Sequence, residues 1–153
     1  TIVVFTHRPH PGVVKRSIAL DGMLKTLPNV KVLSELHVQV PGPIENARKQ
    51  MESILTANPT KGSITAVWAA WDEPAIGATQ AIQAAGRDEI VVTGIDGTSQ
   101  AVDLIKKGSP LVASMQQNFR GMAELVTLQI ENTFAGKKSA STEMFAPALL
   151  ITK

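Results

Sequence analysis

The sequence contains no cysteine and no tyrosine, and aromatic residues make up only 4% of its 153 positions. The lack of cysteine excludes disulfides, thiolate nucleophiles and cysteine-bound zinc. The lack of aromatics removes most of the stacking surfaces on which proteins bind single-stranded nucleic acids. The basic residues are scattered along the chain and give a formal net charge of only +2, so they form no basic stripe. We therefore expect no nucleic-acid partner.

Long apolar runs and processing signals are also lacking. No run approaches the roughly 18 residues that a membrane span requires, and no secretory signal opens the chain, which begins at Thr1. The composition is 44% hydrophobic and 18% charged. It suits a single compact domain that buries about two thirds of its unfolded surface.

Local signatures of catalysis are missing as well. The sequence has no GxSxG elbow, no GxxxxGK[ST] phosphate loop, no HExxH zinc motif and no GxGxxG after its first apolar run. His7 and His10 lie close together in a Pro-rich loop, but no carboxylate stands nearby in the sequence to complete a metal site. We therefore expect neither catalysis nor a bound metal or cofactor.

The sequence does contain a regular alternation of short apolar runs and longer helical patterns. The runs are continuous, which is typical of parallel strands buried on both faces. They fall at residues 2–5, 30–33, 64–69, 89–95, 110–116 and 148–152. The helical patterns fall at residues 13–27, 43–56, 73–85, 99–107 and 119–135. This order predicts an α/β fold with a doubly wound, mostly parallel sheet.

Polar or aromatic residues follow four of the predicted strands, and ligands of such sheets bind outside the carboxyl ends of the strands. His7, Arg8 and His10 follow the first strand, and Trp71 follows the third. Asp96 ends the fourth, and Gln117 follows the fifth. These groups suit a neutral, hydroxyl-rich ligand, because amides and carboxylates pair with hydroxyls and an indole covers an apolar ring face. The pattern does not resemble a phosphate cradle.

Each of these positions also has a structural interpretation. Asp72 is expected mainly to cap the helix that it precedes, with ligand contact as the alternative. Asp96 stays free for a ligand, since Thr98 or Ser99 can cap the next helix. Trp71 either fills the core or forms a stacking platform that carries a hydrogen-bond donor on its rim.

Several motifs occur in a fixed order between residues 64 and 117. They are WDEP before an AIGA helix, an AAG stop, and a strand that ends in GIDGT. In this order they are similar to the ribose-type sugar-binding proteins of ABC importers, which carry an Asn-Asp-Glu turn, an ALGA helix and a G-[FI]-D-G-T turn. The resemblance implies one lobe of the two-lobed type I periplasmic binding protein fold, with the first lobe preceding Thr1.

The resemblance also implies a division of the chain. Residues 1–117 correspond to the second, C-terminal lobe, and residues 147–153 to a final strand that returns to it. Residues 118–146 correspond to a crossover helix and connection that normally pack on the first lobe. Without that lobe, we expect the apolar helix to fold back, to swap between chains or to form a homodimer interface, because apolar area is rarely left in water.

The resemblance assigns roles to three site residues. Asp96 matches the aspartate that binds sugar hydroxyls, and Gln117 matches the glutamine at the crossover after the fifth strand. Trp71 stands where the family has a ligand-binding asparagine, so a stacking surface replaces a bidentate amide. This departure puts ribose itself in doubt as the ligand.

A second departure concerns the ligand arginine of the family, which falls on Val14 in this sequence. Arg8, His10 or Arg16 are the candidates to compensate for it. Of these, Arg16 is expected mainly to form structural ion pairs.

The function that the resemblance implies is binding without chemistry. A sugar or polyol is held between lobes that close by a hinge, and the closed protein docks on an ABC permease from the periplasmic or extracytoplasmic side. One alternative is the effector domain of a lac-repressor-type regulator, which shares the fold but typically has G-F-D-D in place of GIDGT. The other is an α/β sugar-modifying enzyme.

Overall fold

The computed structural model describes residues 1–138, 141 and 143–153, which form one six-stranded sheet and five helices. The strands are β1 (Ile2–Thr6), β2 (Val32–His37), β3 (Ala66–Ala69), β4 (Val91–Asp96), β5 (Leu111–Gln116) and β6 (Leu149–Thr152). The helices are α1 (Pro11–Leu24), α2 (Pro43–Ala57), α3 (Asp72–Ala84), α4 (Ser99–Lys106) and α5 (Phe119–Phe134). The sheet order is β2-β1-β3-β4-β5-β6, and only the β5–β6 pair is antiparallel. The predicted doubly wound, mostly parallel sheet is confirmed.

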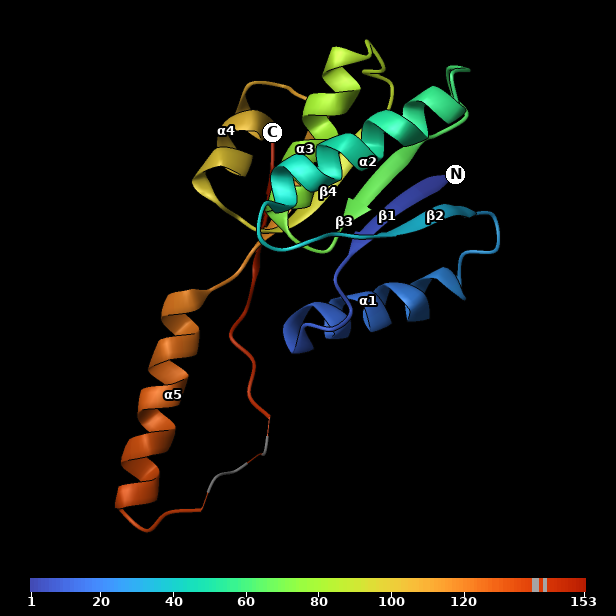
Figure 1. The fold of residues 1–153 in the computed structure, drawn as a ribbon. Coiled ribbons are helices and arrows are strands. Elements are labelled where there is room, and N and C mark those ends of the chain that lie inside the picture. Colours follow the sequence, from blue (N-terminus) through green and yellow to red (C-terminus); the bar gives the residue numbers. More distant parts are fainter. Residues whose placement is uncertain (139–140, 142) are drawn as a thin grey trace.

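The helices cover the two faces of the sheet unequally (Figure 1). Helices α2, α3 and α4 lie on one face and α1 lies on the other, as right-handed crossovers from a central β1 require. Neighbouring residues of a strand point to opposite faces of the sheet, so the exposure of two adjacent residues of β4 shows how well each face is covered. Val92 is fully buried, whereas Val91 is 39% exposed. The face that carries α1 is therefore only partly covered over β4.

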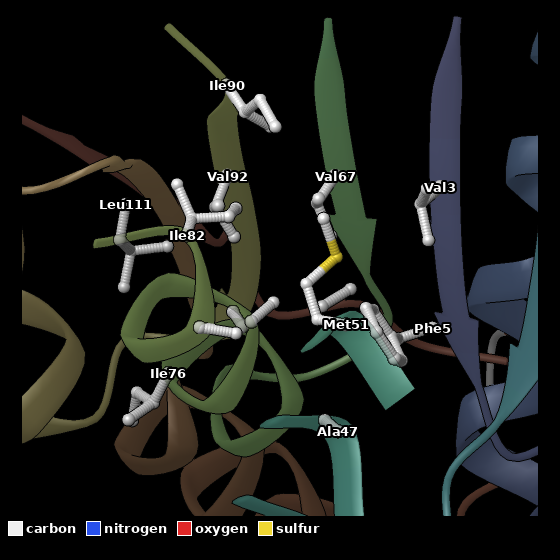
Figure 2. Close-up of a cluster of buried hydrophobic side chains, with 14 of the residues drawn as sticks. Val3, Phe5, Ala47, Met51, Val67, Ile76, Ile82, Ile90, Val92 and Leu111 are labelled. Atoms are coloured by element: carbon white, nitrogen blue, oxygen red, sulfur yellow. The ribbon is translucent and has the colours of Figure 1, made fainter. Parts of the chain in front are cut away.

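The core lies between α2, α3 and the sheet (Figure 2). Met51 of α2 reaches toward Phe5 and Val67, and Ile82 of α3 packs over β4; all four side chains are at most 1% exposed. Helices α2 and α3 approach so closely that a Cβ added to Gly77 would lie 2.2 Å from the carbonyl oxygen of Ile44. This close packing fixes where α3 begins, and with it the position of the residues just before it.

The bounds of most elements agree with the sequence pattern, and the main difference is at β2. The apolar run predicted a strand at 30–33, whereas β2 spans Val32–His37 and pairs with the whole of β1. This strand is at the edge of the sheet, and Glu35 and His37 are exposed on it. Its position is set by backbone pairing with β1, which the side-chain pattern does not record.

Helix α5 extends away from the sheet, and residues 143–148 run back beside it to β6 (Figure 1). Every residue of α5 is half-buried or exposed, with Phe134 at 89%. A groove of about 910 Å³ lies between α5 residues, including Val126 and Ile130, and Met144 of the return segment. Of the three alternatives expected for this helix, folding back onto the body is not what the structure shows; a swap or a dimer stays a prediction. No helix among the described residues is long and apolar enough to cross a membrane.

Candidate ligand-binding pocket

Strands β1, β3, β4 and β5 end at a common pocket of about 310 Å³. Trp71, Asp96 and Gln117 reach it from the ends of β3, β4 and β5, and His10 and Arg16 reach it from the start of α1. The structure thus brings together five of the six residues that the sequence proposed. The strand-end rule found His10, Trp71, Asp96 and Gln117, because parallel strands deliver their carboxyl ends to one edge. Arg16 was proposed from the family resemblance.

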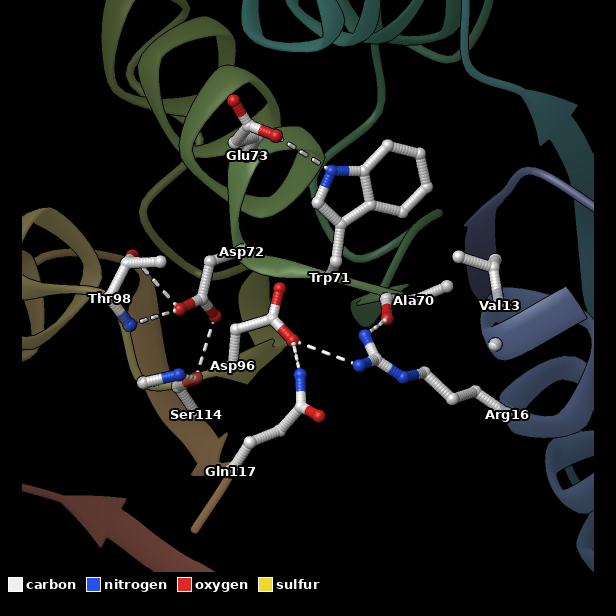
Figure 3. A network of polar contacts seen from close by, with 12 residues as sticks. Val13, Arg16, Ala70, Trp71, Asp72, Glu73, Asp96, Thr98, Ser114 and Gln117 are labelled. Carbon is white, nitrogen blue, oxygen red and sulfur yellow. Dashed lines mark hydrogen bonds and ion pairs between the residues drawn. The ribbon is translucent and has the colours of Figure 1, made fainter. Parts of the chain in front are cut away.

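Asp96 is at the centre of the polar contacts in the pocket (Figure 3). Its Oδ1 accepts hydrogen bonds from Arg16 Nη2, at 2.9 Å, and from Gln117 Nε2. Among the described residues none donates to Oδ2, and the side chain is 21% exposed. Its backbone φ is 136°, in a region that side-chain-bearing residues rarely adopt. Asp96 is therefore held in an uncommon conformation with one oxygen available.

Arg16 ties the first helix to the ends of two strands. Its Nη1 donates to the carbonyl oxygen of Ala70 at 2.6 Å, and its Nη2 donates to Asp96. The expected ion pair is present, and the side chain is 22% exposed at the pocket wall. Arg16 therefore forms an ion pair with Asp96 and also lines the pocket.

Trp71 immediately precedes α3, in extended backbone conformation, and is only 9% exposed. Its indole Nε1 donates to Glu73 Oε2 at 3.1 Å. The ring of His7 contacts it edge-on, with centroids 6.4 Å apart. The expected hydrogen-bond donor on the rim is therefore already used by Glu73, and Trp71 offers the pocket its ring alone.

The two loop histidines are oriented by the backbone. His10 Nδ1 accepts hydrogen bonds from the Gly12 and Val13 N–H groups and so caps α1. His7 Nδ1 lies 2.9 Å from the carbonyl oxygen of Val38, so it carries the proton that bonds to this acceptor. The described residues include no cluster of three His, Asp or Glu side chains suited to a metal ion.

Arg8, the sixth proposed residue, does not line the pocket. It pairs with Asp21 at 3.0 Å and with Glu35 at 2.5 Å, tying the loop after β1 to α1 and β2. Glu35, and then Asp21, raise the pKa of Arg8 above its ordinary range. The hydrogen bond from Arg8 lowers the pKa of Asp21 below its usual value. With all its contacts on this side, Arg8 is placed as a structural residue.

Asp72 neither caps α3 nor reaches the pocket, which corrects the expectation from the sequence. No side chain of the described residues caps this helix. Asp72 is fully buried and accepts hydrogen bonds from the Thr98 N–H and from the hydroxyls of Thr98 and Ser114. Thr98 in turn caps α4 by accepting from the Ala101 N–H, as one of the two expected caps.

Three lining residues were not among the proposed ligand contacts, although His7 was one of the polar residues noted after the first strand. His7 follows β1, Val13 is in α1 and Val40 belongs to the loop after β2. His7 had a usable signal, because it stands in the same strand-end loop as His10. Val13 and Val40 had none, since a valine carries no functional group that marks a site. The two valines add apolar surface to a pocket that is also lined by Asp96 and Gln117.

Comparison with known proteins places this geometry in a family. Residues 1–138 match the family of periplasmic binding protein domains. A ribose import binding protein of Salmonella typhimurium is 40% identical over 67 residues, which are 44% of this chain and 21% of that protein. A D-apiose import binding protein of Actinobacillus succinogenes is 37% identical over 82 residues, 54% of this chain and 26% of that protein.

Solved structures give the same result over nearly the whole chain. An ABC transporter solute-binding protein from Agrobacterium vitis with bound allitol is 35% identical, with a TM-score of 0.88. A sugar transporter subunit from Rhodobacter sphaeroides is 32% identical, with a TM-score of 0.85. Each match covers 99% of this chain but only 53% and 55% of the other. The chain therefore spans about half of these structures, and it belongs to the periplasmic binding protein domain family, where it resembles the ribose-type members.

Proposed function

We propose that this chain is the substrate-binding component, in part or whole, of an ABC importer for a sugar or polyol. The observation that carries the proposal is the Asp96 carboxylate, which faces the pocket beside Trp71 and Gln117 with Oδ2 unpaired among the described residues. A carboxylate oxygen in such a place accepts hydrogen bonds from ligand hydroxyls. A sugar or polyol as the ligand is supported by the similar proteins, two of which are named for the import of ribose and D-apiose and one of which was solved with bound allitol.

The other lining groups complete the recognition of a hydroxylated ring or chain. Gln117 donates through Nε2 to Asp96, which leaves its carbonyl oxygen for a hydroxyl. The Trp71 ring packs on the apolar C–H face of the ligand, as aromatic platforms do with sugars. Arg16 takes over part of the task of the arginine that Val14 replaces. The ligand is bound and released without chemical change.

The proposal extends to partners that the chain does not contain. Residues 1–117 form one wall of a cleft, and a first lobe forms the other and closes over the ligand by a hinge. Residues 118–146 cross to that first lobe, and residues 147–153 return. The closed form delivers the ligand to a permease from the periplasmic or extracytoplasmic side. Where no first lobe is present, α5 covers its apolar side chains by swapping or dimerising with a second copy.

An NMR titration of the ¹⁵N-labelled chain with allitol, D-ribose and glucose tests the binding role. We expect shifts of the Trp71 indole and Gln117 side-chain signals, with weak affinity because one lobe leaves the ligand half in water. Asp96→Ala abolishes them, and Asp21→Ala, outside the pocket, retains them. Absence of shifts with every probe, equal binding by Asp96→Ala, or conversion of a sugar would overturn the proposal. Sub-micromolar affinity would refute the half-site interpretation.

A further inference from the structure

A buried carboxylate lies directly behind the pocket and joins three strand ends. Asp72 Oδ2 accepts from the Thr98 N–H at 2.7 Å and from Thr98 Oγ1 at 3.0 Å. Its Oδ1 accepts from Ser114 Oγ at 2.6 Å. Asp72 itself follows the end of β3, Thr98 follows β4, and Ser114 is in β5. These are the three strands that carry Trp71, Asp96 and Gln117.

Asp72 has no cation to offset its burial. It is 0% exposed, and no Lys, Arg or His of the described residues pairs with it. A buried charge is costly unless hydrogen bonds satisfy it, and all three of its bonds come from neutral donors of distant segments. Because these hydrogen bonds are needed to satisfy the buried carboxylate, they also hold Thr98 and Ser114 in place.

Two of the three donors belong to Thr98, in the turn that carries Asp96, and the third, Ser114, is bonded to the same turn. Ser114 Oγ, which donates to Asp72, also accepts from the Gly97 N–H at 3.1 Å. The N–H groups of Gly97 and Thr98, the two residues after Asp96, are thus both fixed by one network. Asp96 and Gly97 have φ values of 136° and 71°. Such backbone conformations persist only where the surroundings over-determine them.

Close packing around two glycines also restricts this turn. A Cβ on Gly94 would lie 2.4 Å from Asp72 Oδ1, and a Cβ on Gly97 would lie 2.4 Å from the Cβ of Gln116. Strand β4 therefore passes directly over the carboxylate, and the turn passes directly over β5. Only glycine permits both approaches.

We propose that Asp72 is a positioning residue for the ligand site: through Thr98, Ser114 and Gly97 it holds Asp96 with its carboxylate aimed into the pocket. The role rests on the proposed function, because it acts on binding only through Asp96. Asp72 is not a ligand contact, since it is fully buried and does not line the pocket. When the network is broken, the turn relaxes and the carboxylate of Asp96 leaves Arg16 and Gln117.

The test distinguishes a local loosening of the turn from a general loss of stability and from a change in ligand binding. Amide hydrogen exchange is measured for Gly97 and Thr98, with Val92 in the preceding strand β4 as the internal reference. In Asp72→Asn we expect exchange of the two turn amides to rise by about tenfold to a hundredfold, because an amide group cannot accept at every position of the carboxylate. Thr79→Val removes another fully buried polar group of α3 and is the matched control. It leaves the two turn amides unchanged relative to Val92.

Binding is measured by titration with allitol in the same variants. We expect about tenfold weaker affinity in Asp72→Asn and an intermediate loss in Ser114→Ala, which removes the bridge to Gly97 but keeps the bonds to Thr98. If Asp72→Asn does not fold, Ser114→Ala decides both measurements. Uniformly faster exchange across β4, or unchanged allitol affinity despite a loosened turn, would overturn the positioning role. If wild type binds no probe, the proposed function fails, and the exchange result still decides whether Asp72 holds the turn.

Discussion

Helices α3 and α5 are both rich in apolar residues, yet α3 is mostly buried and α5 is not. In α3, nine of the 13 residues are buried against α2, β3 and β4. In α5, all 16 residues are half-buried or exposed, and Ile130 is 51% exposed. An apolar stripe therefore shows that a helix needs a partner, but it does not show that the partner belongs to the same stretch of chain.

The largest expected difference between the two helices is in amide hydrogen exchange. Amides of α3 exchange only by global or large-scale unfolding, whereas an uncovered helix of 16 residues is marginal in water and opens locally. We expect α5 amides to exchange on the order of 10³-fold faster than those of α3, measured by NMR at low protein concentration. Protection of α5 equal to that of α3 would break the comparison and would indicate that a second copy covers it.

Truncation of one isoleucine in each helix sharpens the same comparison. Ile82→Ala in α3 leaves a cavity in the core and is expected to lower the free energy of unfolding by about 2–5 kcal/mol. Ile130→Ala in α5 is expected to change it by less than about 0.5 kcal/mol. Urea denaturation followed by circular dichroism checks both. A cost at Ile130 that matches the cost at Ile82 would mean that α5 is packed in solution.

The close packing of α3 on α2 is tested by alanine substitution of two glycines, one in the contact and one outside it. Gly77→Ala forces a methyl group against the backbone of Ile44 and is expected to cost about 1–3 kcal/mol of unfolding free energy. Among the described residues, no atom outside the adjoining backbone of α1 and the neighbours of Gly22 lies within 4 Å of a Cβ built on Gly22. Gly22→Ala is therefore expected to gain up to about 1 kcal/mol from higher helix propensity. A lower melting temperature for Gly77→Ala and a higher one for Gly22→Ala, each relative to wild type, would bear this out. Equal shifts in the two variants would contradict it.

The smallest expected effects come from surface ion pairs, one on α1 in the body of the molecule and one on α5. Because Arg8 lowers the pKa of Asp21, this pair stabilises the fold above the unfolded pKa and loses its contribution as the pH falls through the folded one. Asp21→Asn should therefore cost less than about 1 kcal/mol at pH 7, and the difference should shrink as the pH falls below the unfolded pKa of this carboxyl and vanish below its folded pKa. Glu124→Gln, which removes the exposed Arg120 pair on α5, should cost almost nothing at any pH. Denaturation across pH measures both, and a pH-independent difference at Asp21 would contradict the assignment.

The fold was predictable because its signals are local. Runs such as 64–69 and glycine stops such as Gly86 mark elements within a few residues. Strand β2 was misplaced because an edge strand is only weakly apolar and takes its register from β1. The strand-end rule likewise gave Trp71 and Asp96, whose position in the pocket follows from topology alone.

The role of Asp72 was not predictable in the same way. Its partners Thr98 and Ser114 are 26 and 42 residues away, and a carboxylate at a helix start has an ordinary local explanation as a cap. The use of the Trp71 N–H by Glu73 is local, but it depends on a side-chain rotamer that the sequence does not fix. Contacts between distant segments and side-chain rotamers are therefore the features of the site that only the three-dimensional structure shows.

The absence of tyrosine gives the position of Trp71 an optical consequence. Intrinsic fluorescence of this chain arises from Trp68 and Trp71 alone. Trp68 is half-buried in β3, while Trp71 lines the pocket. A Trp68→Phe variant thus carries one emitter, located where a guest molecule would rest. Its emission maximum and its quenching by iodide would report occupancy without any attached dye.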